Sequence, residues 1–405
     1  MTESNTMSPP LEEELIQWAE RYRKDLESLS TQIHEQPELS GAEHIAANLH
    51  MRLLRKRGFF ILHPFLDLDT AFWAEYDSGI PGPSVAYLAE YDALPGIGHG
   101  CGHNLLGAVS TVSGIALSRV VERSGGRVVV VGCPAEETNG AKVRMASAGV
   151  FENIDAAMLA HPYKHFQASG SSAALEALRF EFYGREAHAA DSPEAGVNAL
   201  AGVLELFQTV KILRNNLPKG ASINGVITHG GTVANLIPKY ACAEFHLRGR
   251  NGTQVGRMSE ELQRQAKEIA AQIGARVECS HYEADYQNMV TNQALSQAFL
   301  EYLRRLGREK IWPSEDSRFS LDMGNVSQVC PAIHPYFDIC GESKEELHTE
   351  AFCACAVTKY ANEQALTTVK ALALTGLKIL QDSEFLRSVK EEFYSTISNN
   401  KGETP

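Results

Sequence analysis

The spacing of apolar side chains along the first 58 residues is that of amphipathic helices. Leu15, Ala19 and Tyr22 recur at steps of three and four residues. Gln36-Pro37 interrupts this pattern with a turn. We therefore expect helices over 11–58, broken near residue 36.

Short apolar runs then alternate with helical stretches. The run Arg127–Cys133 is almost wholly apolar, as is typical of a strand buried on both faces of a parallel sheet. Strands are expected at Thr70–Tyr76, Ser84–Tyr91, Arg127–Cys133 and Ala156–Ala160, and helices at Leu105–Glu122 and Lys142–Ala148. This alternation predicts an α/β domain with a helix-flanked, mostly parallel sheet.

The pattern changes near residue 173 to strict alternation of apolar and polar positions. Leu178, Phe180 and Phe182 alternate with polar residues, which predicts a strand with one wet face. Helices are expected next at Ala195–Leu213 and Val255–Ile273, and strands at Ala221–Thr228, Tyr240–Arg248 and Arg276–Tyr282. The order β-α-β-β-α-β predicts a ferredoxin-like α+β domain.

We interpret this second domain as a lid, residues 173–286, inserted into the first domain. The first domain then consists of residues 11–172 and 287–393, with further helices expected at Asn292–Leu306 and Val357–Leu380. Only the ends of the chain, before Leu11 and after Phe393, have the composition of loose tails.

Composition excludes several classes of protein. The chain has 405 residues and a net charge of −13, without a basic cluster that could follow a phosphate backbone, so we expect no nucleic-acid partner. No apolar run approaches the roughly 18 residues of a membrane span. The acidic start, MTESNTMSPPLEEE, does not resemble a secretory signal, so a cytoplasmic location is expected.

Side chains able to bind a metal ion occur where strands end or loops begin. Cys101 and His103 lie in a glycine-rich loop, and Glu136-Glu137 follow a buried strand. Glycines allow two ligands to converge, and paired carboxylates at the carboxyl edge of a parallel sheet often belong to a site. Each signal also has a simpler interpretation, since a Cys-x-His pair is a weak indication and two glutamates can be solvated charges at a helix start.

Two histidines add to this set. His161 ends an expected strand, and His348 lies in the polar segment before the last long helix. Alone, His161 could be structural and His348 a surface residue without a role. Together with the preceding candidates, they supply sulfur, nitrogen and oxygen ligands that suit Zn²⁺, with Mn²⁺ or Co²⁺ as alternatives.

A series of motifs in a fixed order resembles a known family. They are EYDALPGIGHGCGHN, PAEETNGAK, AHP, GREAHAADSPEAGVNAL, GVITHGGTVANLIP, LDMGNVSQVCPAIHPYF and HTE. The chain is similar to the amidohydrolase branch of the dinuclear metallopeptidases, which includes aminoacylases, hippurate hydrolase and auxin-conjugate hydrolases. It is most similar to the subgroup of p-aminobenzoyl-glutamate hydrolase and the β-alanyl-lysine-type dipeptidase.

The resemblance implies a role for each matching residue. It implies two divalent metal ions, with Cys101 bridging them and with Glu136 as the general base. The remaining metal ligands would be His103, Glu137, His161 and His348. Asp92 would orient the ligands, while the lid residues His188, Asn235 and Arg248 would hold the oxyanion and the substrate's carboxylate.

The implied reaction is hydrolysis of an amide in an N-acyl amino acid, an aryl-amide conjugate or a dipeptide with a free carboxylate. Two departures from the branch's common pattern bear on the substrate. Asn104 and Leu106 stand where Asp and His are commoner, and Ser320-Leu321-Asp322 replaces a commoner Ser-Thr-Asp. The first departure distances the substrate from that of the aminoacylases, and the second is a change near the expected pocket.

Two other functions fit the sequence less well. A catalytically silent homologue that binds a carboxylated ligand is disfavoured, because the base and all five candidate ligands are present together. A dinucleotide-binding dehydrogenase is excluded, because GIGHGC lacks the glycine spacing of that fold. The resemblance also implies a homodimer, paired through the edge of the lid's first strand and its amphipathic helix.

Overall fold

The computed structural model describes residues 10–317 and 319–402, which form two compact units. The first unit contains the chain up to Ser171, Val290–Asp316 and the chain from Asn325 onward. The second unit contains Ser172–Met289 and Ser317–Gly324. The segment Ser317–Gly324 thus groups with the lid, whereas the sequence pattern assigns it to the first domain.

Three helices begin the first unit, with the break expected near Pro37. They are α1 (Leu11–Arg21), α2 (Arg23–His34) and α3 (His44–Lys56). The apolar positions that predict them, such as Leu15 and Ala19, are fully buried in the unit's core.

A six-stranded sheet forms the centre of the first unit, in the order β1-β2-β4-β3-β5-β13. The neighbours β4-β3-β5-β13 are parallel, and β1 and β2 add antiparallel strands at one edge. The strands are β1 (Phe60–Leu62), β2 (Phe72–Asp77), β3 (Ser84–Ala89), β4 (Arg127–Gly132), β5 (Ala156–Met158) and β13 (Ala332–Ile333). The predicted mostly parallel α/β sheet is confirmed.

Helix α4 (His103–Ser118) is buried along its whole length. It contacts β3 and β4 as well as α2 and the long helix α12 (Lys359–Gln381), so it forms an inner layer. This position requires the apolar and small residues of its sequence, because every face of the helix meets protein. Shorter or more peripheral helices are α5 (Val121–Ser124), α6 (Ala141–Ser147), α9 (Gln293–Arg305), α10 (Met323–Ser327) and α11 (Glu350–Cys355).

A second, two-stranded parallel sheet pairs β6 (His161–Tyr163) with β14 (Tyr336–Asp338). His161 therefore begins a strand of this small sheet, and the expectation that it ends a strand of the main sheet is wrong. β5 stops at Met158.

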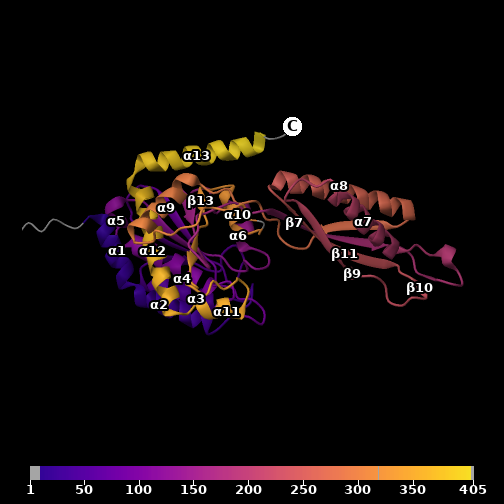
Figure 1. The fold of residues 1–405 in the computed structure, drawn as a ribbon, viewed down its shortest axis with the longest axis horizontal. Coiled ribbons are helices and arrows are strands. Elements are labelled where there is room, and N and C mark those ends of the chain that lie inside the picture. Colours follow the sequence, from indigo (N-terminus) through magenta and orange to yellow (C-terminus); the bar gives the residue numbers. More distant parts are fainter. Residues whose placement is uncertain (1–9, 318, 403–405) are drawn as a thin grey trace, which may run out of the picture. The chain divides into compact units, whose positions relative to one another are not determined.

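The chain's last helix, α13, spans Ser383–Gly402, so the expectation of a loose tail after Phe393 is wrong for residues 394–402 (Figure 1, yellow). Val389 is fully buried, and Glu392 accepts the backbone N–H of Gln293 and Ala294 at the start of α9. A carboxylate at a helix N-terminus is favourable, and this contact docks α13 on the unit.

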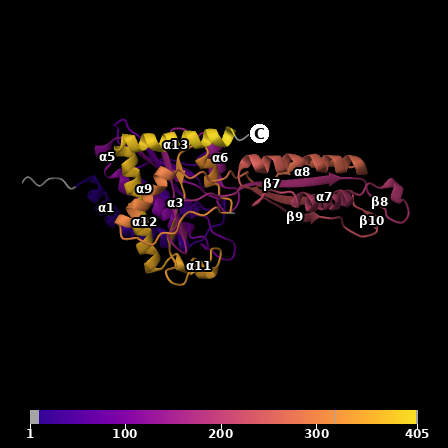
Figure 2. The same ribbon diagram turned by 45° about the horizontal axis from the view of Figure 1, so that its top comes forward.

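The second unit has a four-stranded antiparallel sheet in the order β12-β7-β11-β9. Its main elements follow the predicted order β7 (Ala174–Tyr183), α7 (Ala199–Arg214), β9 (Ser222–His229), β11 (Tyr240–Gly249), α8 (Gly252–Ile273) and β12 (Arg276–His281). The helices α7 and α8 contact each other and the sheet, around a core of its own (Figure 2). The ferredoxin-like topology is confirmed.

The structure places helix α7 later than expected. The segment before it contains β8 (Ala187–His188), paired with β10 (Leu236–Ile237), and the short 3-10 helix Pro193–Ala195. Asn198 caps α7 by accepting the backbone N–H of Leu200, which explains where the helix begins.

Among the residues that the structure describes, no helix combines the length and apolar character that crossing a membrane requires.

Candidate metal centre

Cys101 lies immediately before helix α4, in a loop whose shape depends on Gly102. Gly102 has a φ of 78°, and a Cβ there would lie 2.8 Å from Cβ of Pro162. Any other residue would be strained and would clash with the segment that carries His161. Burial raises the pKa of the Cys101 thiol, so a thiolate here depends on nearby positive charge, to which the N-terminus of α4 would add.

Two buried histidines present the same ring nitrogen to the centre. Nδ1 of His103 lies 2.8 Å from Oδ1 of Asp92, and Nδ1 of His161 lies 2.7 Å from the carbonyl oxygen of Pro162. These contacts suit a proton on Nδ1, which leaves Nε2 as the basic nitrogen. Nε2 of His161 lies 3.4 Å from Sγ of Cys101.

The loop after β4 carries Glu136 and Glu137. Asp92 also holds this loop, because its Oδ2 accepts the backbone N–H of Glu137 at 3.0 Å. The preceding residue, Ala135, has a φ of 59°, and Glu43 accepts its N–H at 2.8 Å. A left-handed alanine costs about 1–2 kcal/mol. The hydrogen bonds to the buried carboxylates of Glu43 and Asp92 hold the backbone in this strained turn beside the two glutamates.

His348 is half-exposed and reaches the centre from the segment after β14. Its backbone also has a left-handed φ of 63°, and its N–H donates to the carbonyl of Gly100 at 2.9 Å. Nε2 of His348 lies 3.7 Å from Oε1 of Glu137. The segment that carries His348 is therefore tied directly to the loop of Cys101.

The candidate ligand atoms converge in overlapping groups. Atoms of Cys101, His103 and His161 lie within 4.8 Å of one another, as do those of Cys101, Glu137 and His348. A third group joins Glu136 to His103 and Glu137. The Cys101 thiol belongs to the first two groups, so it could contribute to the binding of two ions.

Burial and charge at the centre suit bound cations. Nε2 of His103 and Oε1 of Glu137 are buried and have no hydrogen-bond partner among the described residues, as expected of metal ligands. Although burial opposes it, Cys101 and Asp92 raise the pKa of His103 well above its usual range. The surroundings of His103 thus stabilise positive charge.

Burial and neighbouring groups also shift the pKa values of His161 and Asp92. Burial lowers the pKa of His161 to about 3, so the ring is neutral. Burial acts to raise the pKa of Asp92, but His103 and the surrounding hydrogen bonds hold it at about 2. Asp92 is therefore a carboxylate that can accept all its hydrogen bonds.

Sequence reasoning missed a buried ion pair beside His103. Nζ of Lys142 lies 2.8 Å from Oε1 of Glu90, and Oε2 of Glu90 lies 3.3 Å from Nε2 of His103. It also missed His334, whose ring stacks on His161 with centroids 5.5 Å apart. Glu90 lies two residues before Asp92 and could have been noticed, but no local signal distinguishes Lys142 or His334.

The lid residues implied by the family resemblance lie in two places. His188 on β8 pairs in register with Leu236, and the carbonyl of Asn235 accepts the N–H of Ala189, so His188 and Asn235 are neighbours. Arg248 lies near the far end of β11, where Nη1 donates to Oγ of Ser320 at 2.7 Å. The run of β11 from Tyr240 to Arg248 spans about 27 Å.

The residues that depart from the branch's common pattern are placed as follows. Asn104 is fully buried and donates to Oγ of Ser30 at 2.9 Å, and Leu106 is also fully buried. These two substitutions therefore alter the packing beneath the centre. Ser320 is the hydrogen-bond partner of Arg248.

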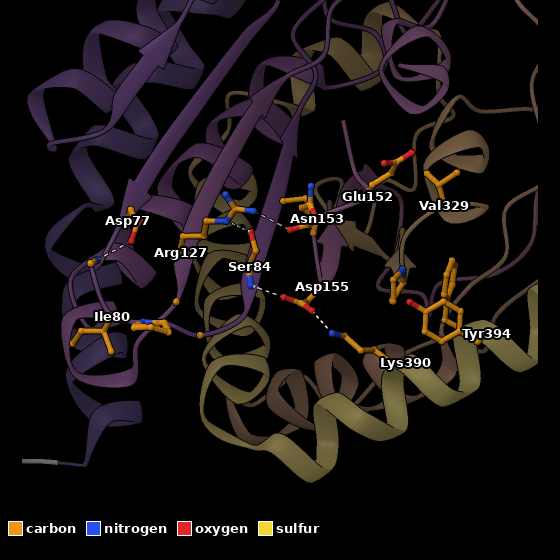
Figure 3. A pocket seen from close by; sticks show the side chains of 17 residues that line it. Asp77, Ile80, Ser84, Arg127, Glu152, Asn153, Asp155, Val329, Lys390 and Tyr394 are labelled. Atoms are coloured by element: carbon orange, nitrogen blue, oxygen red, sulfur yellow. Dashed lines mark hydrogen bonds and ion pairs between the residues drawn. The ribbon is translucent and has the colours of Figure 1, made fainter. Parts of the chain in front are cut away.

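A cavity of about 830 Å³ lies at the opposite edge of the main sheet, near the first residues of β3 and β4 (Figure 3). Among its lining residues, Arg127 donates to Oγ of Ser84 at 3.0 Å and Asp155 pairs with Lys390. None of the candidate metal ligands lines this cavity. Its size therefore does not make it the reactive site.

Comparison with known proteins gives a consistent picture. A family model described as a peptidase dimerisation domain matches residues 175–274. The human Xaa-Arg dipeptidase is 33% identical, over 91% of this chain and 88% of its own length. A p-aminobenzoyl-glutamate hydrolase of Escherichia coli is 29% identical, over 91% of this chain and 92% of its own.

A solved structure supports the fold. A dinuclear metal-binding peptidase of the M20 family from Bacillus subtilis superposes with a TM-score of 0.67 at 22% identity. The match covers 89% of this chain and 99% of that protein. The two-unit architecture is thus shared over nearly the whole length of both proteins.

Proposed function

Because this chain belongs to the M20 family of dinuclear metallopeptidases, we propose that it hydrolyses the amide bond of a dipeptide, an N-acyl amino acid or an aryl-amide conjugate with a free carboxylate. The observation that carries the proposal is the thiol of Cys101, which belongs to two of the three groups of candidate ligands, and the third group contains Glu136. The family is one of metal-dependent amide hydrolases, and the two relatives compared above are hydrolases. The substrate and the residue roles are our proposals.

We assign the two ions to Cys101, His103, Glu137, His161 and His348. The buried ligand atoms without hydrogen-bond partners among the described residues support this assignment, as does the stabilisation of positive charge at His103. The mixture of sulfur, nitrogen and oxygen suits Zn²⁺, with Mn²⁺ or Co²⁺ as alternatives. When bound, the ions would polarise the scissile carbonyl and lower the pKa of the attacking water.

Glu136 is the proposed general base. Its carboxylate lies among the ligand atoms of His103 and Glu137, within 4.8 Å of both. From there, it would take a proton from the attacking water and return it to the leaving amine. The base and the ligand Glu137 are adjacent in the chain, so one loop would determine the distance between the base and the ions.

Arg248 is the proposed contact for the substrate's carboxylate. A guanidinium binds a carboxylate through two parallel hydrogen bonds, and the Nη1 atom of Arg248 already donates to Ser320, which holds the group in place. The two relatives are named for a dipeptide ending in arginine and for a glutamate conjugate. We therefore favour substrates whose amine-side product is an amino acid with a charged side chain.

We further propose a homodimer that pairs through the lid, in accordance with the matched dimerisation domain. The expected surface needs correction, because the lid's first strand, β7, is hydrogen-bonded on both sides. An open edge is instead provided by β9, where Val226 and Ile227 are exposed. Exposed apolar residues on the neighbouring helix α7, Leu204 and Ile212, extend this surface.

The length of β11 supports a role for the second copy. Arg248 lies about 27 Å along the strand from the end near His188 and Asn235, so one lid cannot bring all three to one small substrate. We propose that Arg248 of one copy and His188 and Asn235 of the other copy act on the same substrate. His188 would then stabilise the developing oxyanion in a site shared between subunits.

The test is a substrate screen with metal-loaded protein. Xaa-Arg dipeptides, p-aminobenzoyl-glutamate and N-acyl amino acids are supplied, and the released amines are quantified. We expect turnover in at least one class, lost in Glu136→Gln while the metal content per chain is kept. Turnover retained by that variant would contradict the role of the base.

Two controls separate the alternatives. The matching carboxamide of the best substrate should be cleaved poorly, and Arg248→Ala should reduce cleavage of the carboxylate far more than that of the carboxamide. Binding of substrates without any turnover would favour the silent homologue instead. We propose a cytoplasmic location, which the eight free cysteines support.

A further inference from the structure

The two backbone amides that flank Glu136 are both bound by buried carboxylates. Glu43 accepts the N–H of Ala135 at 2.8 Å, and Asp92 accepts the N–H of Glu137 at 3.0 Å. Glu43 comes from the start of α3, and Asp92 follows β3. The backbone on both sides of Glu136 is thus held by side chains from two separate elements.

Ala135 is the pivot of this loop. Its φ of 59° lies in the left-handed region, which alanine rarely adopts. Its carbonyl accepts the N–H of Gly140 at 2.7 Å and that of Thr138 at 3.3 Å, which closes the loop around Glu136 and Glu137. The dihedral angles of Ala135 therefore determine where the loop, and Glu136 with it, points.

Glu43 is fully buried, and hydrogen bonds from three donors engage both of its oxygens. Oε1 accepts the N–H groups of Gly41 and Ala135, and Oε2 accepts the hydroxyl of Thr70, each at 2.8 Å. A buried carboxylate is costly unless such donors surround it. Burial raises the pKa of Glu43, and the hydrogen bonds from Gly41 and Thr70 oppose that rise, while the remaining contact holds the N–H of Ala135.

We propose that Glu43 is a positioning residue for Glu136, which acts by holding Ala135 in the left-handed conformation. Glu43 binds the backbone of Ala135, the residue next to the base, and does not itself touch the reacting atoms. The inference rests on the proposed role of Glu136. It concerns the rate of the chemical step, since the metal ligands other than Glu137 are held by other contacts.

The first experiment compares two variants of Glu43 in the metal-loaded enzyme. Glu43→Ala removes the acceptor, and we expect kcat to fall about 10- to 100-fold, because small displacements of a reacting group have effects of that size. KM and the metal content should change little. Glu43→Gln keeps an oxygen for Gly41 and Ala135 and can donate to Thr70, so it should restore most of kcat.

The second experiment separates positioning from general stability. Glycine adopts positive φ without strain, so adding Ala135→Gly to Glu43→Ala should recover kcat by about tenfold. Thr70→Val serves as the matched control, because it removes a buried donor to Glu43 and leaves the contact with Ala135. It should lower the melting temperature with kcat close to wild type.

Hydrogen exchange gives a readout independent of turnover. The amide of Gly140 should exchange faster in Glu43→Ala than in wild type, and normally in Glu43→Gln. If Glu43→Ala does not fold, Glu43→Asp is used, whose shorter carboxylate cannot reach Ala135 from the same backbone position. It should lower kcat in the same way.

Two results would overturn the inference. One is an unchanged kcat in Glu43→Ala or Glu43→Asp, and the other is a loss of kcat that neither Glu43→Gln nor Ala135→Gly restores. The variant Glu136→Gln distinguishes failure of the proposed function from failure of this inference. If that variant is inactive while Glu43→Ala is fully active, only the role of Glu43 is refuted.

Discussion

Replacing Asp92 with asparagine would test how the centre keeps its ligands in place. Asp92 accepts hydrogen bonds on both oxygens, from His103 on one side and from Glu137 N–H and the Ser40 hydroxyl on the other. An asparagine oxygen turned to His103 leaves an amide facing the N–H of Glu137. In the opposite orientation, the asparagine NH2 group faces Nδ1 of His103. Nδ1 would then have to accept a hydrogen bond, and the ring's proton would move to Nε2.

Either orientation loses one charge-assisted hydrogen bond, worth about 1.5–3 kcal/mol. At about 1.4 kcal/mol for each factor of ten, this corresponds to roughly a 10- to 100-fold weaker affinity for metal, a range also seen when groups behind metal ligands are changed. Asp92 is fully buried, so solvent screening reduces this effect little.

The affinity is measured by titrating apoprotein with Zn²⁺ against a competing chelator at neutral pH. Asp67→Asn is the matched control, because its side chain is 98% exposed and lies in the same unit. An Asp92→Asn protein that folds and binds both ions within about twofold of wild type would refute this account of the centre.

Four further outcomes are expected. Chelation should lower the melting temperature, and added Zn²⁺ should restore it; an unchanged melting curve would contradict metal binding to the folded chain. Lys142→Met should destabilise the protein in urea more than the double variant with Glu90→Gln does, since the single change leaves the buried Glu90 carboxylate without its lysine partner. Burial lowers the pKa of His50 from 6.5 to about 3, so the unfolded chain binds a proton between these values that the native chain does not. The free energy of unfolding should therefore decrease as the pH is lowered below 6.5. By about pH 4, His50→Gln should remove up to about 3 kcal/mol of this decrease; equal pH profiles of the two proteins would refute this. Val226→Lys on the open edge of β9 should shift sedimentation toward monomer, and an unchanged dimer would exclude this surface.

The elements that position the centre could be predicted because their sequences have a clear period. The apolar run of β4 and the alternation along β7 each correspond to a strand. The candidate ligands were predictable for a related reason, since Cys101 and Glu137 follow buried strands whose carboxyl ends meet at one edge.

Asp92 was expected from the family resemblance, but Lys142 and Glu43 could not be predicted as supporting residues, because a buried charge and a solvated charge have the same appearance in a sequence. Lys142 begins a helix in an ordinary polar context, yet it is fully buried against Glu90. Glu43 lies 92 residues from Ala135, so only the folded chain brings them together. The helix at the end of the chain escaped prediction because its apolar residues are sparse, although Phe385 and Val389 have the spacing of a helix.

The insertion of the lid has a consequence for the order in which the protein forms. Cys101, His103, Glu137 and His161 all leave the ribosome before the lid, and His348 leaves after it. A nascent chain that has just completed the lid would therefore carry only four of the five proposed ligands. The ions could be bound fully only after the segment with His348 has been made and has folded onto the earlier part of the first unit. Metal binding would then be a late step in the formation of the protein.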